Sequence, residues 1–156
     1  MWTYQTSIVI EAPAATVWRL LSIVTDWPRW LSTVSSVEAL DGDALAVGHR
    51  FKLLQPKLKP AVWTISLVHP SRRFAWQSRS PGMRMVAYHE VERLASYRTL
   101  VRLRFEFHGL VGTLLGRIFS ATTKRYVDLE ARALKAAAEH ASTAARRPAA
   151  GWPITG

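Results

Sequence analysis

Few side chains in this 156-residue sequence have surroundings that suggest chemistry, and His89 is the first of them. It alternates with the apolar residues of segment 83–91, so on a β-strand its imidazole would share their face. An imidazole on an apolar face needs a hydrogen-bonding partner, which could be a ligand, a backbone carbonyl or Tyr126. We therefore take His89 as the candidate general acid or base, with an ordinary core histidine as the alternative.

Other catalytic patterns are missing from the sequence. The chain has no Cys, which excludes disulfides, thiolate metal ligands and a cysteine nucleophile. Its five His show no spacing typical of a metal site, and the phosphate-binding, dinucleotide-binding and serine-nucleophile motifs are absent. Glu90 and Glu92 share one strand face with Arg84, which favours an exposed ion-pair patch over a catalytic carboxylate pair. We accordingly expect no metal and no cofactor.

The charge is strongly positive, at +10 from 21 Lys and Arg against 11 Asp and Glu. Such a balance can attract nucleic acid or anionic lipid. It can also reflect a compositional bias toward Arg. The cations are spread along the chain and form no run longer than two, as at Arg72-Arg73. We favour the compositional interpretation and expect no nucleic-acid partner.

Alternating apolar and polar residues predict a sheet that must position His89. Val101, Leu103 and Phe105 alternate with Arg102 and Arg104, which is typical of a strand with one dry face and one wet face. Short turns between successive strands favour an antiparallel meander. The predicted strands are 2–11, 34–40, 49–55, 61–68, 73–79, 83–93 and 98–107, with short helices at 15–24 and 27–31.

Segment 112–141 is the one stretch long and regular enough for a major helix. Its apolar and small residues recur at steps of three and four, which is the spacing of one helix face. These residues are Leu115, Ile118, Phe119, Thr122, Tyr126, Leu129, Ala133 and Ala137. We expect the sheet to wrap around this helix, with Phe119 in the core.

Length and hydropathy set the remaining expectations. With 49% hydrophobic residues the chain can form one packed core, so we predict a single domain over 1–141 and a flexible tail over 142–156. No apolar run approaches the length of a membrane span, and no secretory leader precedes the first strand. We expect no stable membrane insertion, a cytoplasmic location, and a monomer or weak homodimer.

Two sequence patterns resemble a known superfamily. Ile10-Glu11-Ala12-Pro13 is followed by Val17-Trp18, and Asp26-Trp27-Pro28-Arg29-Trp30 comes next. Over about residues 3 to 140 the chain resembles the START-like (SRPBCC) superfamily, of the polyketide cyclase/dehydrase and lipid-transport type. The resemblance implies an α+β helix-grip fold: a curved antiparallel sheet of about seven strands around a long C-terminal helix, with two short helices after the first strand.

The resemblance also implies a ligand cavity between sheet and helix, opening near Trp27, Trp30 and loop 56–60. We expect the ligand to be a hydrophobic small molecule, lipid or polyketide-like, because the inward-facing positions are rich in aromatic residues and Met. The predicted ligand-binding residues are Phe51, Leu53, Trp63, Ile65, Trp76, Ser78, Met83, Met85, His89, Phe105, Phe107, Phe119, Thr122 and Tyr126. Gln55 and Ile118 also fall on the inward side of the pattern.

Three functions remain open at this point. The first is binding, transport or sequestration of a hydrophobic small molecule. The second is a polyketide cyclase or aromatase in which His89, with Tyr126 or Ser78, supplies the acid and base. The third is a stress-response or interaction domain without a small-molecule role. The superfamily resemblance does not choose between them, because one fold serves many functions.

Overall fold

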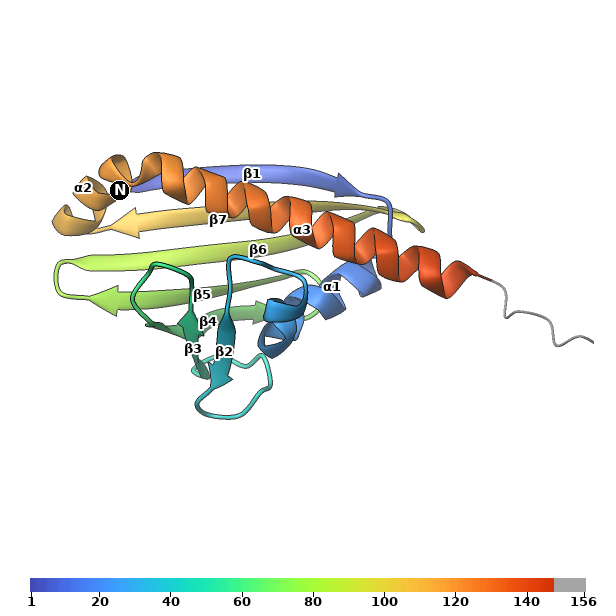
Figure 1. The fold of residues 1–156 in the computed structure, drawn as a ribbon, viewed down its shortest axis with the longest axis horizontal. Coiled ribbons are helices and arrows are strands. Elements are labelled where there is room, and N and C mark those ends of the chain that lie inside the picture. Colours follow the sequence, from blue (N-terminus) through green and yellow to red (C-terminus); the bar gives the residue numbers. More distant parts are fainter. Residues whose placement is uncertain (148–156) are drawn as a thin grey trace, which may run out of the picture.

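The structure, a computed structural model, describes residues 1–147, and its centre is a curved antiparallel sheet with one long helix across one face (Figure 1). The seven strands lie in the order β1-β7-β6-β5-β4-β3-β2. They are β1 (Trp2–Ile10), β2 (Ser36–Ala39), β3 (Arg50–Leu54), β4 (Ala61–His69), β5 (Arg73–Ser80), β6 (Met83–Ala95) and β7 (Arg98–His108). The predicted fold class, an α+β helix-grip arrangement, is confirmed.

Four helical segments complete the fold. Helix α1 and the 3-10 helix η1 follow the first strand, as predicted, and lie at one end of the sheet (Figure 1). Helix α2 lies at the other end, and α3 crosses the inner face of the sheet (Figure 1). Their bounds are α1 (Ala14–Ser22), η1 (Val24–Arg29), α2 (Leu110–Ile118) and α3 (Ser120–Arg146).

The register of the strands follows the alternation in the sequence. On β7, Val101 and Leu103 are buried toward the helix, while Arg102 lies on the outer face and pairs with Glu92 at 2.8 Å. On β6, His89 faces inward and is paired in register with Phe74 of β5 and Leu103 of β7. The predicted inward position of His89 is thus correct, since a slip of one residue would have exposed it.

Polar contacts at two points hold α3 against β1. Near the start of α3, the Tyr4 hydroxyl donates a hydrogen bond of 2.8 Å to Asp128, and this bond raises the pKa of Tyr4. Near its end, Glu139 accepts hydrogen bonds from Lys135 and, at 3.0 Å, from the backbone N–H of Glu11. These two bonds lower the pKa of Glu139. The hydrogen bonds of Tyr4 and of the Glu11 backbone fix the position of α3 relative to the sheet.

The long helix differs from its sequence prediction in three respects. It is broken at Phe119, so that two helices, α2 and α3, replace one. Ile118 and Phe119, both predicted to face inward, are 62% and 51% exposed. The helix continues to Arg146, beyond the predicted end at residue 141, while 148–156 lie outside the described residues. The buried side of α3 consists of Val127, Ala131, Leu134, Ala138 and Ser142.

The break at Phe119 explains the error in the helix face. A continuous helix would place Phe119 and Thr122 on one face, but the two helices do not share one axis (Figure 1). At 100° per residue, the buried side of α3 lies roughly 140° around the axis from the predicted stripe. Within residues 1–147, no helix combines the length and the hydropathy needed to cross a membrane.

Candidate functional site

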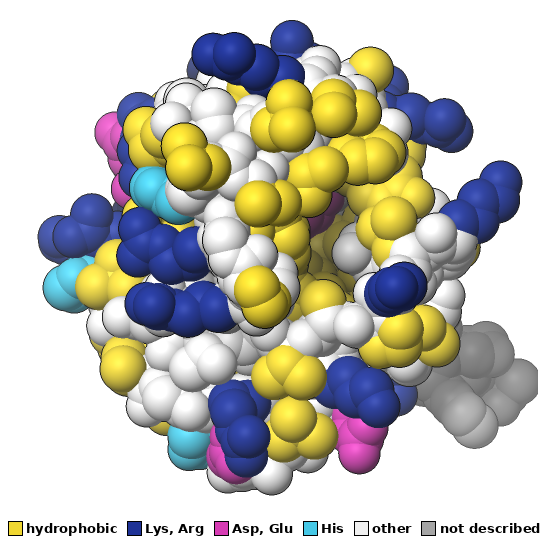
Figure 2. All heavy atoms as spheres, turned by 90° about the vertical axis from the view of Figure 1, so that its left-hand side faces the viewer, with side chains coloured by type: hydrophobic (Ala, Val, Ile, Leu, Met, Phe, Trp, Pro, Cys, Tyr) yellow, Lys and Arg dark blue, Asp and Glu magenta, His cyan; other side chains and the backbone are white. Residues whose placement is uncertain are grey.

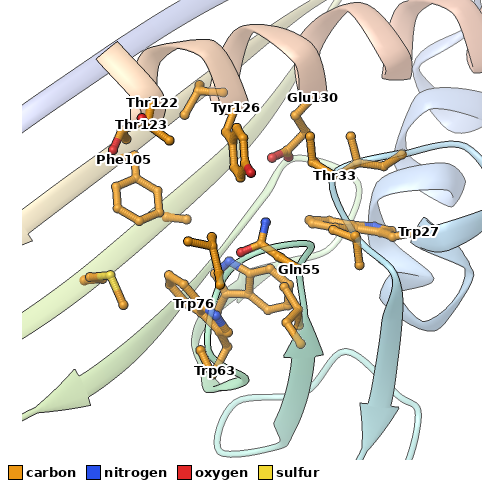
Figure 3. Close-up of a pocket in the computed structure, with 18 of the residues that line it drawn as sticks. Trp27, Thr33, Gln55, Trp63, Trp76, Phe105, Thr122, Thr123, Tyr126 and Glu130 are labelled. Carbon is orange, nitrogen blue, oxygen red and sulfur yellow. The ribbon is translucent and has the colours of Figure 1, made fainter. Parts of the chain in front are cut away.

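A cavity of about 350 Å³ lies between the inner face of the sheet, helix α3 and the loop that joins β3 to β4 (Figure 3). This volume is at the lower end of the range for small-molecule sites. The sheet curves away from the helix here, and the side chains that face each other do not fill the gap. Most of the cavity wall is apolar, with a few polar groups from α3 and the loop.

Aromatic side chains form the sheet side of the cavity. Trp63 on β4 and Trp76 on β5 have ring centroids 5.5 Å apart. Phe105 on β7 lies 6.0 Å from Trp63 and 5.1 Å from Phe107. Each residue alternates with an outward-facing neighbour, so strand periodicity alone brings the four rings to one face. Flat, rigid walls of this kind suit an aromatic or conjugated ligand.

The polar end of the cavity is a pair formed by His89 and Glu130. His89 Nε2 lies 3.0 Å from Glu130 Oε1, and the side chains are 3% and 18% exposed. Because an ionised carboxylate can only accept, Nε2 carries the proton and donates. The other ring nitrogen, Nδ1, is buried with no hydrogen-bond partner among the described residues. The pair therefore presents a carboxylate to the cavity with an imidazole fixed behind it.

The His89 ring is held by aromatic neighbours on three sides. It stacks on Phe74 at 4.3 Å with an interplanar angle of 9°, and the rings of Trp27 and Trp76 meet it edge-on. Trp27 is itself fixed, since its Nε1 donates a 3.1 Å hydrogen bond to the Leu21 carbonyl. The imidazole cannot turn without displacing these rings, which sets its orientation toward Glu130.

Helix α3 supplies the polar groups that line the cavity beside this pair. The side chains of Tyr126 and Glu130 extend from α3 into the cavity, and Gln55 extends toward them from the sheet side (Figure 3). Thr122 and Thr123 lie one turn earlier on the same helix. A ligand with a carbonyl or hydroxyl group would meet both donors and acceptors here. The same groups can deliver or receive a proton.

The cavity opens at the end of the molecule where α2 lies. Phe119, Leu58 and Lys59 belong both to the cavity wall and to the surface. Figure 2 shows this end, where hydrophobic side chains surround a hollow. The expected entrance was correct for loop 56–60 and wrong for Trp27, which is 2% exposed and forms the inner wall. Trp30, the other expected entrance residue, is not part of the cavity wall.

The structure brings together most of the predicted ligand-binding residues around the cavity. Those that line it are Leu53, Trp63, Trp76, Met85, His89, Phe105, Phe107, Phe119, Thr122 and Tyr126. Whether they contact a ligand stays a prediction. Four others lie elsewhere: Phe51 and Ile65 are fully buried core residues, Ser78 is buried, and Met83 packs near Gly112 of helix α2.

Sequence reasoning missed Glu130, which the structure places at the centre of the site. It also missed several apolar or small wall residues. The missed wall residues include Leu31, Thr33, Val34, Ala61, Thr123, Val127 and Glu130. One signal was available: Thr122, Tyr126 and Glu130 follow one another at steps of four, which puts them on one helix face. Within residues 1–147, no three His, Asp or Glu side chains come together as metal ligands.

Comparison with known proteins places the chain in a family. Residues 1–139 match the family model described as polyketide cyclase / dehydrase and lipid transport. No curated protein matches the chain in sequence. Solved structures do match it in fold, and the three described next are below 25% identical, so they bear on the fold alone.

Three of these structures illustrate the range of proteins that share this fold. The Zhui aromatase/cyclase from Streptomyces sp. R1128 has a TM-score of 0.76 at 20% identity, covering 94% of this chain and 98% of that one. A START superfamily protein from Mycobacterium smegmatis has a TM-score of 0.68 at 14% identity, covering 90% and 99%. The di-domain ARO/CYC BexL from the BE-7585A biosynthetic pathway has a TM-score of 0.66 at 23% identity, covering 95% and 48%.

Proposed function

The chain belongs to the polyketide cyclase/dehydrase and lipid-transport family, and we propose that it binds a hydrophobic small molecule in the cavity between the sheet and helix α3. One observation carries this proposal: an aromatic cavity of about 350 Å³ ends in a polar pair and opens to the surface. A protein that needed only a packed core would gain stability by filling that space.

The cavity wall also limits the chemistry of the ligand. Trp63, Trp76 and Phe105 favour a flat, unsaturated ring system over a flexible saturated chain, because aromatic faces stack on one another. Tyr126 and Glu130 favour at least one carbonyl or hydroxyl group on the ligand, since buried polar groups require partners. We infer a ligand of the aromatic polyketide type, with its oxygenated end toward Glu130.

A second function has a specific observation in its favour. The His89–Glu130 pair supplies two coupled proton-transfer groups at the inner end of the cavity, where a bound carbonyl compound would meet them. Cyclisation and aromatisation require a proton to leave a carbon next to a carbonyl and another to reach an oxygen. In that role Glu130 would exchange protons with the ligand, and His89 would fix and stabilise the carboxylate behind it. Two of the structural relatives are described as aromatase/cyclases.

Binding of a neutral reporter dye tests the first proposal. Wild-type protein is expected to bind Nile red with one site per chain. Ala87→Trp adds an indole inside the cavity and should abolish the binding while the protein stays folded. Ala136→Trp, the same change on the exposed side of α3, is the control and should bind the dye normally. Unchanged dye binding by a folded Ala87→Trp protein would favour an interaction domain instead.

Two variants, His89→Ala and Glu130→Gln, test the second function, that of a cyclase or aromatase. A carrier that loses one neutral hydrogen bond should lose about 1 kcal/mol of affinity. An enzyme should lose on the order of 10² to 10⁴ in rate, with ligand affinity nearly unchanged. The substrate is a poly-carbonyl chain, and its cyclised product is followed by absorbance. The cytoplasmic location and the monomer or weak-homodimer state stay predictions.

A further inference from the structure

Helix α2 has its small residues inside and its large apolar residues outside. Gly112 and Gly116 are buried against the end of the sheet. A Cβ atom at Gly116 would lie 2.8 Å from Trp2 Cβ, and one at Gly112 would lie 3.1 Å from Met83 Cγ. The helix thus contacts the sheet through its backbone.

The outward side of α2 is apolar and unusually exposed. Leu110 is 92% exposed, Ile118 62% and Leu114 59%. With Val111 they fall within about 100° of the helix circumference, given 100° per residue. Phe119 and, across the cavity opening, Leu58 are also half exposed. We call these six residues the apolar rim: Leu58, Leu110, Val111, Leu114, Ile118 and Phe119.

The segments that carry the apolar rim also carry a marked excess of positive charge. Segments 54–60, 79–84 and 110–126 contain seven Lys or Arg and no Asp or Glu. Within residues 1–147, none of these seven forms an ion pair. We call them the basic ring: Lys57, Lys59, Arg79, Arg84, Arg117, Lys124 and Arg125. Figure 2 shows Lys and Arg side chains standing around the hydrophobic area at the hollow.

We propose that this end of the molecule docks on the surface of an anionic lipid bilayer. The apolar rim would enter the boundary between headgroups and acyl chains, and the basic ring would contact lipid phosphates. Neither component suffices alone, because stable peripheral binding takes an apolar contribution and an electrostatic one together. A nucleic acid would match the basic ring but would leave the six apolar side chains in water.

The docking face surrounds the opening of the cavity. Phe119 and Leu58 belong to both the apolar rim and the cavity wall. A docked protein would therefore have its cavity open toward the bilayer, and an apolar ligand could pass between them without crossing water. The docking itself rests on the surface alone and not on the proposed ligand. The clustering also revises the sequence interpretation of the charge, because cations scattered along the chain are gathered here by the fold.

Vesicle flotation with the full chain tests the proposal. Wild-type protein is expected to float with vesicles of phosphatidylcholine and phosphatidylglycerol at about 0.15 M salt. Pure phosphatidylcholine should bind it far less. Leu114→Gln with Ile118→Gln should weaken the partition by at least about tenfold per side chain. Arg117→Gln with Arg125→Gln should weaken it by about fivefold per cation.

Matched controls separate docking from general loss of apolarity or charge. Leu94→Gln removes a 47% exposed apolar residue at the end of β6, next to the β6–β7 turn and at the opposite end of the sheet (Figure 1). Arg93→Gln with Arg132→Gln removes two cations outside the basic ring. Both controls should float like wild type. Melting temperature and Nile red binding should be unchanged in every variant, since none of the substituted residues lines the cavity.

Three outcomes would overturn the proposal. The first is no flotation of the wild type with anionic vesicles. The second is equal losses in the apolar-rim variant and in Leu94→Gln, which would mean that binding is not local. The third is concentration-dependent dimerisation that Leu114→Gln with Ile118→Gln abolishes, without vesicle binding, which would assign the apolar rim to a second copy of the chain.

Discussion

His89 Nε2 on strand β6 lies 3.0 Å from Glu130 Oε1 on helix α3, and this contact joins the sheet to the long helix inside the cavity. The His89 side chain is almost fully buried, whereas the Glu130 carboxylate reaches the cavity. The pair can thus have two roles: its contact joins the sheet to helix α3, and its carboxylate is accessible to a ligand. Separate experiments can measure the contribution to stability and the contribution to binding.

A double-mutant cycle on unfolding measures the contribution to stability. Glu130→Ala should cost about 1–3 kcal/mol, because it leaves the buried imidazole without a partner on either nitrogen. Glu130→Gln should cost about 1 kcal/mol or less, since the amide oxygen can still accept from Nε2. With His89→Ala as the second mutation, the coupling energy should be about 0.5–3 kcal/mol in urea unfolding. A coupling energy of zero would mean that the contact adds nothing to stability.

Stability measurements also test the revised position of Phe119. This side chain is half exposed at the cavity opening, so Phe119→Ala should change the free energy of unfolding by less than about 1 kcal/mol. Leu134 is fully buried on the inward side of α3, and Leu134→Ala should cost about 2–5 kcal/mol. Urea denaturation of the two variants measures both changes. Equal losses would restore Phe119 to the core, where the sequence placed it.

Much of the sheet was predictable because strand patterns are local. Alternation at Val101, Leu103 and Phe105 fixes which side of β7 faces inward, and short turns fix its neighbours. His89 was placed correctly for the same reason. The Trp63–Trp76 contact followed once both strands had the right register, since each residue's face is set by a period of two.

The helix side of the site was harder to predict. Which face of α3 points inward depends on the break at Phe119, and the periodicity of the sequence does not reveal that break. Ile118 and Phe119 continue the apolar pattern of Tyr126 in sequence, yet they belong to different helices or to the junction. The predicted helix face was wrong, and Glu130 was not among the predicted site residues. Its role depends on tertiary contact with His89, 41 residues earlier in the chain, and local spacing carries no information about that contact.

The contact between Gly116 and Trp2 predicts whether Gly116→Ala raises or lowers the stability of the fold. In a helix free of tertiary contacts, Gly→Ala raises stability by up to about 1 kcal/mol. Gly116→Ala should instead lower it by about 1–3 kcal/mol, because the new Cβ would meet Trp2 Cβ at 2.8 Å and the backbone would have to shift. Thermal unfolding measures the difference. A higher melting temperature would show that α2 moves freely relative to β1.

The last prediction concerns pH and the contact that fixes the end of α3. Glu139 accepts hydrogen bonds from Lys135 and from the backbone N–H of Glu11, and these bonds lower the pKa of Glu139 below its ordinary value of 4.5. A lowered pKa in the folded state means that the ionised carboxylate stabilises the fold. This contribution is complete above the unfolded pKa and is lost as pH falls through the folded one.

Glu139→Gln should therefore be less stable than wild type at about pH 6, and the difference should shrink steadily below about pH 4.5. Lys135→Gln removes the larger of the two causes and should reproduce most of the effect. The double variant should lose less than the sum of the two single variants, because both substitutions break the Lys135–Glu139 contact, while Lys135 also donates to the Val9 carbonyl. Urea unfolding at a series of pH values measures all four proteins. A difference between wild type and Glu139→Gln that stays constant from pH 6 to pH 3 would mean that the carboxylate gains nothing from its partners, and that packing of Leu134 and Ala138 alone holds this end of the helix.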